Sequence, residues 1–439
     1  MSNTPARVQL LTYGCQMNEY DSELVAAILA RNGYALVHDS RTADVFLVNT
    51  CAVRETANTR VYARLSQLLA QKKDRPELTV GVLGCIPQNL KGELLERFPG
   101  LDFICGPDSY RHLPELIAAA RNESQRGAVV DLSEYETYAD IAPARVPGVN
   151  AWIAIMRGCD NFCSFCVVPF TRGRERSRDP ENILEETRQL ARDGYKQVTL
   201  LGQNVNSYHA NDMDFAALIE EVACVEGIER VRFTSPHPKD FPEHLLEVIA
   251  RNFRICAHIH FPLQAGADHV LEKMNRGYTL DQFLRLVDVM RRTIPELTLT
   301  TDIICGFPNE SDADFGETER ALRQIEFDSA FIFKYSSREG TPAAKRFADD
   351  VPDKIKSDRV TRLVALQREI SRRKNQEMVG RTYRVLVEGT SKKSPDVLRA
   401  RTDGNKVVLH PPANNLSVGD LCNVLITEAT PNTLLGRVS

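Results

Sequence analysis

The sequence predicts an α/β protein in three parts: an open α/β sheet domain over residues 1–146, a partial (βα)6 barrel over 147–377 and a small C-terminal β-barrel over 378–439. Three observations support this prediction. With 439 residues, the chain is too long for one ordinary core. Strand and helix patterns alternate both before and after a polar, proline-containing stretch at 135–148, which we expect to be a linker. Beyond the basic helical stretch that ends near residue 381, only short strand patterns separated by turns remain, which is typical of a small barrel.

Strand and helix patterns alternate three times within the first part. The expected strands cover residues 8–13, 44–50 and 78–84. Each strand runs into a cysteine just past its end, namely Cys15, Cys51 or Cys85. The carboxyl ends of parallel strands meet at one edge of a sheet, and open α/β sheets bind ligands there. We therefore expect the three cysteines to share a site, although their spacing alone leaves open that each is a buried packing residue.

The second part repeats the strand–helix pattern six times. The expected strands cover residues 151–156, 197–201, 231–234, 258–262, 297–304 and 329–334. Six units suit a partial barrel better than a complete barrel of eight strands. In barrels of this type the functional residues lie on loops at the carboxyl ends of the strands. We therefore expect the functional residues of this part to lie on those loops.

The loop after the first of these strands holds Cys159, Cys163 and Cys166, with the spacing Cys-x3-Cys-x2-Cys. Three thiolates on one loop can bind three irons of a four-iron cluster, which leaves the fourth iron without a protein ligand. An open coordination position is what a metal needs to bind a substrate. Zinc would need a fourth ligand, and this loop contains no further Cys or His. The spacing therefore favours an iron–sulfur cluster that binds a second molecule.

This loop and the segment 169–178 resemble the methylthiotransferase branch of the radical S-adenosylmethionine (radical SAM) enzymes. The resemblance extends over nearly the whole chain, including Tyr13-Gly14-Cys15-Gln16-Met17-Asn18 and Asn49-Thr50-Cys51-Ala52-Val53-Arg54-Glu55. The third cysteine segment departs slightly, since Ile86-Pro87 precedes Gln88 where Met-Ala is expected. The resemblance implies two [4Fe-4S] clusters, one on Cys159, Cys163 and Cys166, and an auxiliary one on Cys15, Cys51 and Cys85. It implies no catalytic side chain beyond these ligands.

The resemblance also implies that the open iron binds the amino and carboxylate groups of S-adenosylmethionine. An electron from the cluster then cleaves the sulfonium and yields an adenosyl radical. Polar side chains near the strand ends suit the ribose and carboxylate of this cofactor. The candidates are Phe165, Gln203, Asn204, Ser235, Gln264, Arg276 and Thr301. Asn204 is equally compatible with a turn-forming role.

The charge pattern bears on the substrate. The formal net charge is −4, which argues against a general nucleic-acid binder, but positive charge is concentrated locally. Residues 157–178 carry five arginines against two acids, and 354–381 carry nine Lys and Arg against three acids. The second stretch is equally compatible with a solvated helix face. The terminal barrel resembles a TRAM domain, which implies RNA binding. The candidate RNA contacts are Arg172, Arg174, Arg176, Arg178, Lys392, Lys393, Arg399 and Arg401.

The motifs around Cys15 and Cys51 resemble most the branch that adds a methylthio group to carbon 2 of N(6)-isopentenyladenosine beside the anticodon of tRNA. Two S-adenosylmethionine molecules are implied, one as methyl donor and one as radical source. An anticodon loop suits such an enzyme because its bases are accessible unstacked. The nearest alternatives are methylthiotransferases for threonylcarbamoyladenosine in tRNA or for an aspartate of a ribosomal protein. A non-catalytic, zinc-containing RNA-binding protein is the alternative of a different class.

The remaining expectations concern cellular context. No apolar run reaches the ~18 residues that a membrane span needs, and the N-terminus shows no signal-peptide pattern. We therefore expect a cytoplasmic protein that does not associate with membranes. An electron donor such as a flavodoxin or ferredoxin is expected as a partner, and we expect a monomer.

Overall fold

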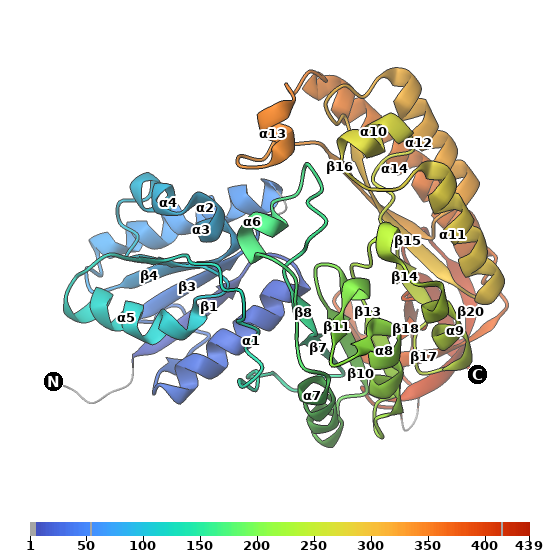
Figure 1. Cartoon of the computed structure of the whole chain (residues 1–439). Coiled ribbons are helices and arrows are strands. Elements are labelled where there is room, and N and C mark those ends of the chain that lie inside the picture. The colour runs from blue at the N-terminus through green and yellow to red at the C-terminus, as the bar shows by residue number, and fades with distance from the viewer. Residues whose placement is uncertain (1–5, 53–54, 414–415) are drawn as a thin grey trace.

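The computed structural model describes residues 6–52, 55–413 and 416–439, so the motif residues Val53 and Arg54 lie outside the described residues. Figure 1 shows the N-terminal sheet domain, in blue, beside a curved central sheet in green to orange. The red C-terminal barrel packs against the central sheet, and the short helix α6 (Val168–Arg172) lies between the first two parts. Within the described residues, no helix has the length and apolar character needed to cross a membrane.

The N-terminal domain contains a six-stranded parallel sheet with the order β2-β1-β3-β4-β5-β6. Its strands are β1 (Arg7–Thr12), β2 (Ala35–Leu36), β3 (Val45–Thr50), β4 (Thr79–Gly84), β5 (Phe103–Cys105) and β6 (Gly127–Val129). Every residue of β3 and β4 is buried, as expected for central strands covered by helices on both faces. The three strands predicted here are confirmed. The strands β2, β5 and β6 were not predicted, because two or three residues are too few to show a periodicity.

Helices cover both faces of this sheet (Figure 1). Side chains of α1 and α5 pack into one core, and side chains of α2, α3 and α4 pack into the other. The helices are α1 (Gln16–Arg31), α2 (Glu55–Ala70), α3 (Cys85–Leu90), α4 (Gly92–Arg97) and α5 (Leu113–Asn122). The helices α1 and α3 begin at the same sheet edge, directly after β1 and β4.

The central part contains six parallel strands that follow one another in chain order, as predicted. They are β7 (Asn150–Ala154), β10 (Gln197–Leu201), β13 (Arg230–Phe233), β14 (His258–His260), β15 (Thr298–Cys305) and β16 (Ser329–Lys334). They form two three-stranded sheets, β13-β10-β7 and β14-β15-β16. A parallel bridge between Val231 and Ile255 continues the first sheet toward β14. The result is an open, partial (βα)6 barrel.

Helices cover the outside of the curved sheet (Figure 1). They include α7 (Pro180–Arg192), α8 (Phe215–Cys224), α9 (Glu243–Arg251), α10 (Asp268–Lys273), α11 (Leu280–Thr293), α12 (Asp312–Ile325) and α14 (Asp353–Gln376). The short helix α13 (Pro342–Arg346) instead lies against the loop after β8, where the amide of Ala343 donates to the carbonyl of Ser164 at 2.7 Å. Two small antiparallel pairs, β8 (Met156–Arg157) with β9 (Arg176–Ser177) and β11 (His209–Ala210) with β12 (Met213–Asp214), follow β7 and β10 in the chain.

The predicted linker contains no helix or strand, but it packs against the N-terminal domain. Tyr138 and Ile141 are buried in the core of the N-terminal domain, and the amide of Ala144 donates to the carbonyl of Glu23 at 3.0 Å. Because the segment is polar, its sequence did not indicate these contacts. The linker therefore holds the first two parts in contact.

The C-terminal part is a closed five-stranded barrel, as predicted, with the order β17-β18-β19-β21-β20. Its strands are β17 (Thr382–Ser391), β18 (Ser394–Thr402), β19 (Val407–His410), β20 (Leu421–Ala429) and β21 (Leu434–Val438). Two buried arginines of β13 dock it. Arg230 Nη1 donates to the carbonyl of Arg401 at 2.6 Å, and Arg232 Nη2 donates to the carbonyl of Thr402 at 2.7 Å. The barrel thus joins the central sheet by charge-assisted hydrogen bonds to its backbone.

Candidate functional site

The strand order of the N-terminal sheet brings Cys15, Cys51 and Cys85 together. Because β1, β3 and β4 are neighbours, the three cysteines follow adjacent strand ends. Cys15 caps α1, Cys51 directly follows β3, and Cys85 is the first residue of α3. The Cys15 and Cys51 side chains are hydrogen-bonded to each other. The structure therefore supports the prediction that these three residues share one site, which we call the auxiliary triad.

Two glycines allow the strand ends to approach so closely. Gly14 has a φ of +153°, and a Cβ there would lie 2.7 Å from the Cβ of Cys51. Gly84 has a φ of +90°, and a Cβ there would lie 2.5 Å from the carbonyl oxygen of Thr50. Any side chain at either position would separate the turns. The motif residue Asn18 adds a tie, since its Nδ2 donates to the Thr50 carbonyl at 3.0 Å.

The electrostatics at Cys15 favour a thiolate. The hydrogen bond with Cys51 lowers the pKa of Cys15 to about 6, and the charge of Arg172 lowers it too, although burial opposes the shift. The position of Cys15 at the start of α1 adds the partial positive charge of a helix N-terminus. Only the deprotonated form of cysteine binds metal, so Cys15 is prepared for ligation.

The second triad, Cys159, Cys163 and Cys166, lies on the loop after β7 and β8, which we call the barrel triad. Gly158 starts this loop with a φ of +81°, and a Cβ there would lie 1.9 Å from the carbonyl oxygen of Arg174. The backbone amide of Gly158 donates to Oε1 of Gln203 at 2.6 Å. The loop therefore depends on a glycine at this position and is tied to the end of the next strand.

The far side of the barrel-triad loop is held by the segment after α10. Asn275 Nδ2 donates to the carbonyl of Phe162 at 3.0 Å, and Ser164 N donates to the carbonyl of Met274 at 2.9 Å. These bonds stabilise Phe162 in a left-handed conformation with a φ of 47°, which a bulky residue rarely adopts. The loop conformation is thus determined by contacts from distant parts of the barrel.

Arg276 and His237 face the barrel triad. Arg276 Nη1 donates to Cys163 Sγ at 3.1 Å, and His237 Nε2 lies 3.9 Å from the same sulfur. Burial, with the charge of Arg276, lowers the pKa of His237 to about 2, so its imidazole is neutral. Nδ1 of His237 accepts from the amide of Lys239, which places the ring proton on Nε2, toward Cys163. Both side chains present a donor to that thiolate.

Burial acts on the other two thiols of this triad. It raises the pKa of Cys159 to about 11 and that of Cys166 to about 12. Such groups ionise at neutral pH only when a metal replaces the proton. Cys159 and Cys166 therefore need iron to become anionic, whereas Cys15 of the auxiliary triad does not.

The chemistry of the donors fits iron, since three thiolates can each bind a different iron of one cluster. Across residues 6–52, 55–413 and 416–439, no three His, Cys, Asp or Glu side chains form a group that could hold one metal ion.

The strand ends around the barrel triad also fit a polar cofactor. The side-chain oxygens of Asn204 and Gln264 are buried and have no hydrogen-bond partner. Gln264 and Ser235 adopt left-handed conformations, with φ of 71° and 61°. Buried polar atoms without a partner are costly, so a ligand that pairs with them binds favourably. These residues remain candidates for binding S-adenosylmethionine.

Other predicted cofactor residues have roles within the fold. The Thr301 hydroxyl accepts from the amide of Leu263 at 2.9 Å, so it supports the strand ends, and its predicted cofactor contact is not supported. Phe165 packs against the core cluster that contains Phe307. Gln203 binds the Gly158 amide, and Arg276 binds Cys163. Arg276 and Gln203 therefore position the barrel triad from the adjoining strand ends.

The predicted RNA contacts at Arg172, Arg176 and Arg178 are not supported, because all three side chains are buried in ion pairs. Arg172 pairs with Asp21 at 2.7 Å, Arg176 with Asp108 at 2.9 Å, and Arg178 with Glu186 at 2.7 Å. Arg174 differs, since 70% of its side chain is exposed. It pairs with Asp160 and lies over the ring of Phe162, 5.5 Å from the centroid. Of the four arginines, only Arg174 is accessible to a large ligand.

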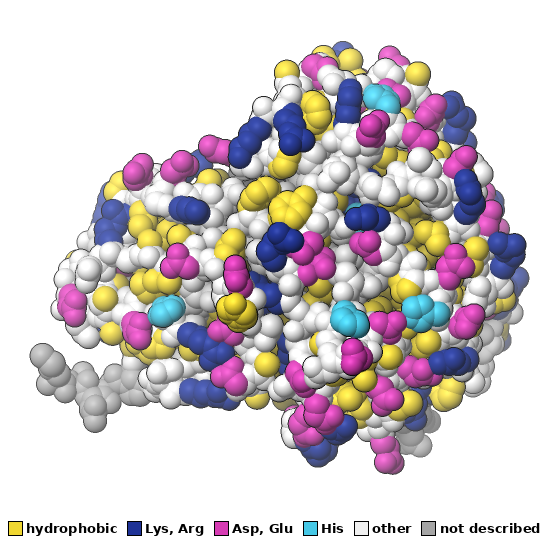
Figure 2. Space-filling view, viewed as in Figure 1, with side chains coloured by type: hydrophobic (Ala, Val, Ile, Leu, Met, Phe, Trp, Pro, Cys, Tyr) yellow, Lys and Arg dark blue, Asp and Glu magenta, His cyan; other side chains and the backbone are white. Residues whose placement is uncertain are grey.

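Some basic residues of the C-terminal half are exposed, and others are held in ion pairs. Lys392 and Lys393 are exposed in the turn between β17 and β18. Arg399 and Arg401 both pair with Glu388 and are partly exposed. On α14, Lys356, Arg359 and Lys374 pair with acids of the central part of the chain. Part of the positive charge of α14 is therefore compensated within the protein. On the face shown in Figure 2, Lys and Arg alternate with Asp and Glu and form no single basic field.

Asp21 is the functional residue that the sequence analysis missed. It lies on α1, six positions after Cys15, and it is fully buried. Oδ1 accepts from Arg157 Nη2 at 2.7 Å, and Oδ2 pairs with Arg172 Nη2 at 2.7 Å. One carboxylate thus joins the segments that carry the two triads. An acid on the apolar face of α1 was the available signal, but its partners lie far away in the chain.

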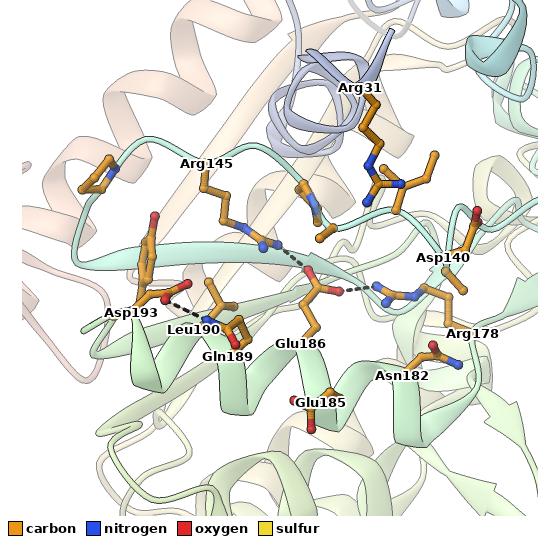
Figure 3. A pocket seen from close by; sticks show the side chains of 16 residues that line it. Arg31, Asp140, Arg145, Arg178, Asn182, Glu185, Glu186, Gln189, Leu190 and Asp193 are labelled. Atoms are coloured by element: carbon orange, nitrogen blue, oxygen red, sulfur yellow. Dashed lines mark hydrogen bonds and ion pairs between the residues drawn. The ribbon is translucent and has the colours of Figure 1, made fainter. Parts of the chain in front are cut away.

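A cleft of about 780 Å3 lies between α7 and the segment 139–147 (Figure 3). Arg145 and Arg178 both pair with Glu186 in its wall, the latter at 2.7 Å. None of the six triad cysteines lines this cleft. Glu186 thus pairs with an arginine from each side, and the cleft lies along the contact between α7 and the linker segment.

Comparisons with known families match all three parts of the chain. Residues 153–322 match the radical SAM superfamily, and residues 376–439 match the TRAM domain. Residues 7–106 match a family described as uncharacterized protein family UPF0004. The expected TRAM barrel and radical SAM barrel are therefore confirmed.

Curated relatives align over almost the full length. One, a tRNA-2-methylthio-N(6)-dimethylallyladenosine synthase of Chloroherpeton thalassium, is 47% identical over 437 residues, which cover 99% of this chain and 96% of the relative. A protein of the same name from Chlorobium luteolum is 46% identical, covering 98% of this chain and 96% of the relative. Another, from Carboxydothermus hydrogenoformans, is 45% identical, covering 95% and 96%.

Solved structures support the fold. The radical S-adenosylmethionine methyltransferase TsrM from Kitasatospora setae has a TM-score of 0.58 at 16% identity, over 77% of each chain. The cobalamin-dependent S-adenosylmethionine radical enzyme OxsB has a TM-score of 0.51 at 12% identity, over 82% of this chain and 56% of its own. At such identities the likeness concerns the fold alone.

Proposed function

Because this chain belongs to the family of tRNA-2-methylthio-N(6)-dimethylallyladenosine synthases, we propose that it adds a methylthio group to carbon 2 of N(6)-isopentenyladenosine next to the anticodon of tRNA. Two S-adenosylmethionine molecules are consumed. The identity of 47% over 437 residues carries the proposal, together with two cysteine triads in one molecule.

We propose that each triad holds one [4Fe-4S] cluster. When bound, the cluster on Cys159, Cys163 and Cys166 supplies the electron that cleaves S-adenosylmethionine, and the cluster on Cys15, Cys51 and Cys85 supplies the attachment point for sulfur. The target C–H bond belongs to an aromatic ring and is not acidic, which is why radical chemistry is required. The protein's own residues bind, orient and shield the reactants.

The proximity of the two triads supports this division of roles. The helix α6 begins two residues after Cys166, and it packs against α3, which begins at Cys85. The barrel triad and the auxiliary triad therefore flank the same short helix. A radical formed at one site and a methylthio donor at the other would reach the same substrate atom without a large movement of the protein.

The strand-end residues orient the cofactor. Asn204, Ser235 and Gln264 offer polar groups to its ribose and methionine parts, and two of them carry buried oxygens that have no partner. Arg276 and the neutral His237 donate toward Cys163 and keep that sulfur in position. Phe165, which belongs to the same loop as Cys163, packs against the core cluster that contains Phe307.

The RNA would bind on the face that carries Arg174 and on the terminal barrel. Lys392 and Lys393 extend from the exposed turn of that barrel, and Arg399 and Arg401 lie on its next strand. Exposed cations of this kind contact phosphates and position the RNA without reading its sequence. An electron donor such as a flavodoxin or ferredoxin, a cytoplasmic location and a monomeric state complete the proposal.

The decisive experiment is mass spectrometry of tRNA nucleosides. The chain, loaded anaerobically with iron and sulfide, is incubated with S-adenosylmethionine, a reductant and an anticodon stem-loop that carries isopentenyladenosine. We expect the methylthio derivative of that nucleoside. Modification of threonylcarbamoyladenosine or of a ribosomal protein instead would overturn the substrate assignment, and a purified chain that holds zinc and no iron would overturn the enzyme assignment.

Variants of the triads provide the controls. Cys159→Ala, Cys163→Ala and Cys166→Ala together should abolish cleavage of S-adenosylmethionine. Cys15→Ala, Cys51→Ala and Cys85→Ala together should leave that cleavage intact and stop methylthiolation. Product from the second variant would contradict the proposed two-cluster arrangement.

A further inference from the structure

We propose that Arg172 is the cationic partner of the auxiliary triad: its Nη1 donates a hydrogen bond to sulfur at the site of Cys15, Cys51 and Cys85 and thereby sets the reduction potential of the cluster held there. Asp21 holds the other end of the same guanidinium. This inference rests on the proposed function, because it requires a cluster at the auxiliary triad. It assigns a positioning role to a residue that touches no substrate.

The first support is an unpaired buried donor. Arg172 is 3% exposed, and its Nη2 is bound to Asp21 at 2.7 Å. Its Nη1 is buried and has no hydrogen-bond partner among residues 6–52, 55–413 and 416–439. Leaving a buried donor unsatisfied costs on the order of 1–3 kcal/mol, more for a charged group. A buried guanidinium with one free end is therefore expected to face a partner that the protein alone does not supply.

The second support is the place of that free end. Arg172 is the last residue of α6, and α6 packs against α3, whose first residue is Cys85. The Asp21 carboxylate that binds its Nη2 lies on α1, the helix that Cys15 caps. The guanidinium therefore lies between the helices that follow two of the three ligands.

The third support is a charge count. Three buried arginines, Arg157, Arg172 and Arg176, share two buried aspartates, Asp21 and Asp108. One positive charge is left in excess. Two tyrosines of the same interior, Tyr110 and Tyr138, do not offset it, because burial raises their pKa values and keeps them neutral. An uncompensated buried charge is strongly destabilising, so an anionic group is expected nearby.

The three arginines differ in the partners that compensate their charge. The Arg157 guanidinium lies over the ring of Tyr138, 4.8 Å from its centroid, which is a cation–π contact. Arg176 is bound at both Nη atoms by the Asp108 carboxylate. Arg172 has neither arrangement within the described residues. The triad of thiolates, with the iron it binds, is the anionic group that remains for Arg172.

The expected consequence is electrochemical. The potential of an iron–sulfur cluster depends on its net charge and on hydrogen bonds to its sulfurs. Reduction adds negative charge, so a nearby cation that donates to sulfur favours the reduced form. Removal of Arg172 should therefore shift the midpoint potential to more negative values. Retention of iron at the auxiliary triad should also fall, because the thiolates lose their counter-charge.

The test isolates the auxiliary cluster. In the full chain with Cys159→Ala, Cys163→Ala and Cys166→Ala, only that cluster remains, and its midpoint potential is measured by titration followed by electron paramagnetic resonance. We expect Arg172→Gln to lower the ratio of reduced to oxidised cluster at least tenfold at fixed potential, which corresponds to a shift of about 59 mV for one electron. Arg172→Lys keeps the charge but cannot bridge Asp21 and sulfur, so a smaller shift in the same direction is expected.

Arg176→Gln in the same background is the matched control. Arg176 comes from the same segment, is also buried and is also paired with an aspartate, but both of its Nη atoms are bound by Asp108 and only its Nε is left without a partner among the described residues. It should lower stability like Arg172→Gln and leave the potential unchanged. Equal shifts in the two variants, or no shift in either Arg172 variant, would overturn the inference. If Arg172→Gln fails to fold, Arg172→Lys decides. The tRNA assay on the unaltered chain tests the proposed function separately.

Discussion

Asp21 and Arg157 form a buried ion pair of 2.7 Å between Oδ1 and Nη2, although they lie 136 positions apart in the chain. Asp21 belongs to the helix that begins just after Cys15, and Arg157 precedes Cys159 by two residues. This pair therefore joins the two parts of the protein where each one carries its cysteines. The relative position of the two triads depends on it.

Replacing Asp21 tests that dependence. Asp21→Asn removes the carboxylate that two buried arginines share, so we expect a loss of about 3–5 kcal/mol in the free energy of unfolding, measured with urea on the metal-free chain. Glu181→Gln, which breaks an exposed pair with Arg188, is the control and should have no measurable effect. Similar unfolding midpoints for the two variants would show that the buried pair is not needed.

Gly158→Ala should remove the barrel cluster. The new Cβ would lie 1.9 Å from the Arg174 carbonyl oxygen, and the φ of +81° is unfavourable for alanine. We expect iron to fall from about eight to about four atoms per chain, since a four-iron cluster is lost. Gly194→Ala controls for the backbone conformation alone, because Gly194 has a φ of +88° and open space around its Cα. An unchanged iron content in Gly158→Ala would contradict the prediction.

Glu23 should make stability depend on pH. Burial raises its pKa to about 7, and Arg145, 3.3 Å away, only partly offsets this. The folded protein therefore holds a proton that the unfolded chain releases near pH 4.5, so the contribution of Glu23 to stability is full below pH 4.5 and is lost as pH rises to 7.

The variant Glu23→Gln isolates that contribution. Glutamine does not titrate, so the free energy of unfolding of the variant relative to the unaltered chain should rise by up to ~2 kcal/mol between pH 5 and pH 8. Urea unfolding at several pH values measures the difference. A difference that stays constant, or that falls with rising pH, would mean that Glu23 is ionised in the folded protein.

Arg232 should hold the C-terminal barrel in place. Its guanidinium donates to the carbonyls of Thr402 and Asp403 at 2.7 and 2.9 Å. We expect Arg232→Ala to expose the junction after α14 to trypsin and to weaken binding of the anticodon stem-loop, while iron content stays the same. Arg251→Ala, which breaks an exposed pair with Glu220, should leave cleavage at the junction after α14 unaltered. Equal digestion of the two variants would show that Arg232 does not dock the barrel.

The sequence by itself determined the local features. The six strands of the partial barrel and the five of the terminal barrel follow from periodicity within short windows, and the structure confirms them. The spacing of Cys159, Cys163 and Cys166 is equally local. The position of Cys15, Cys51 and Cys85 after three strands of one parallel sheet was also predicted, while their common cluster stays a prediction that the family resemblance implies. The short strands β2, β5 and β6 were not predicted, because their extended conformation depends on pairing with neighbouring strands of the sheet.

Only the tertiary structure decided which arginines of the basic segment are exposed and which are buried in ion pairs. Arg172, Arg174 and Arg176 alternate with other residues in one basic segment, and composition alone assigned them all to an RNA surface. The structure leaves Arg174 exposed and buries the other two against Asp21 and Asp108. The physical reason is that the sign of a charge is a property of the residue, whereas its role depends on the counter-charge that folding brings to it. Those aspartates lie in another domain, beyond the reach of any local pattern.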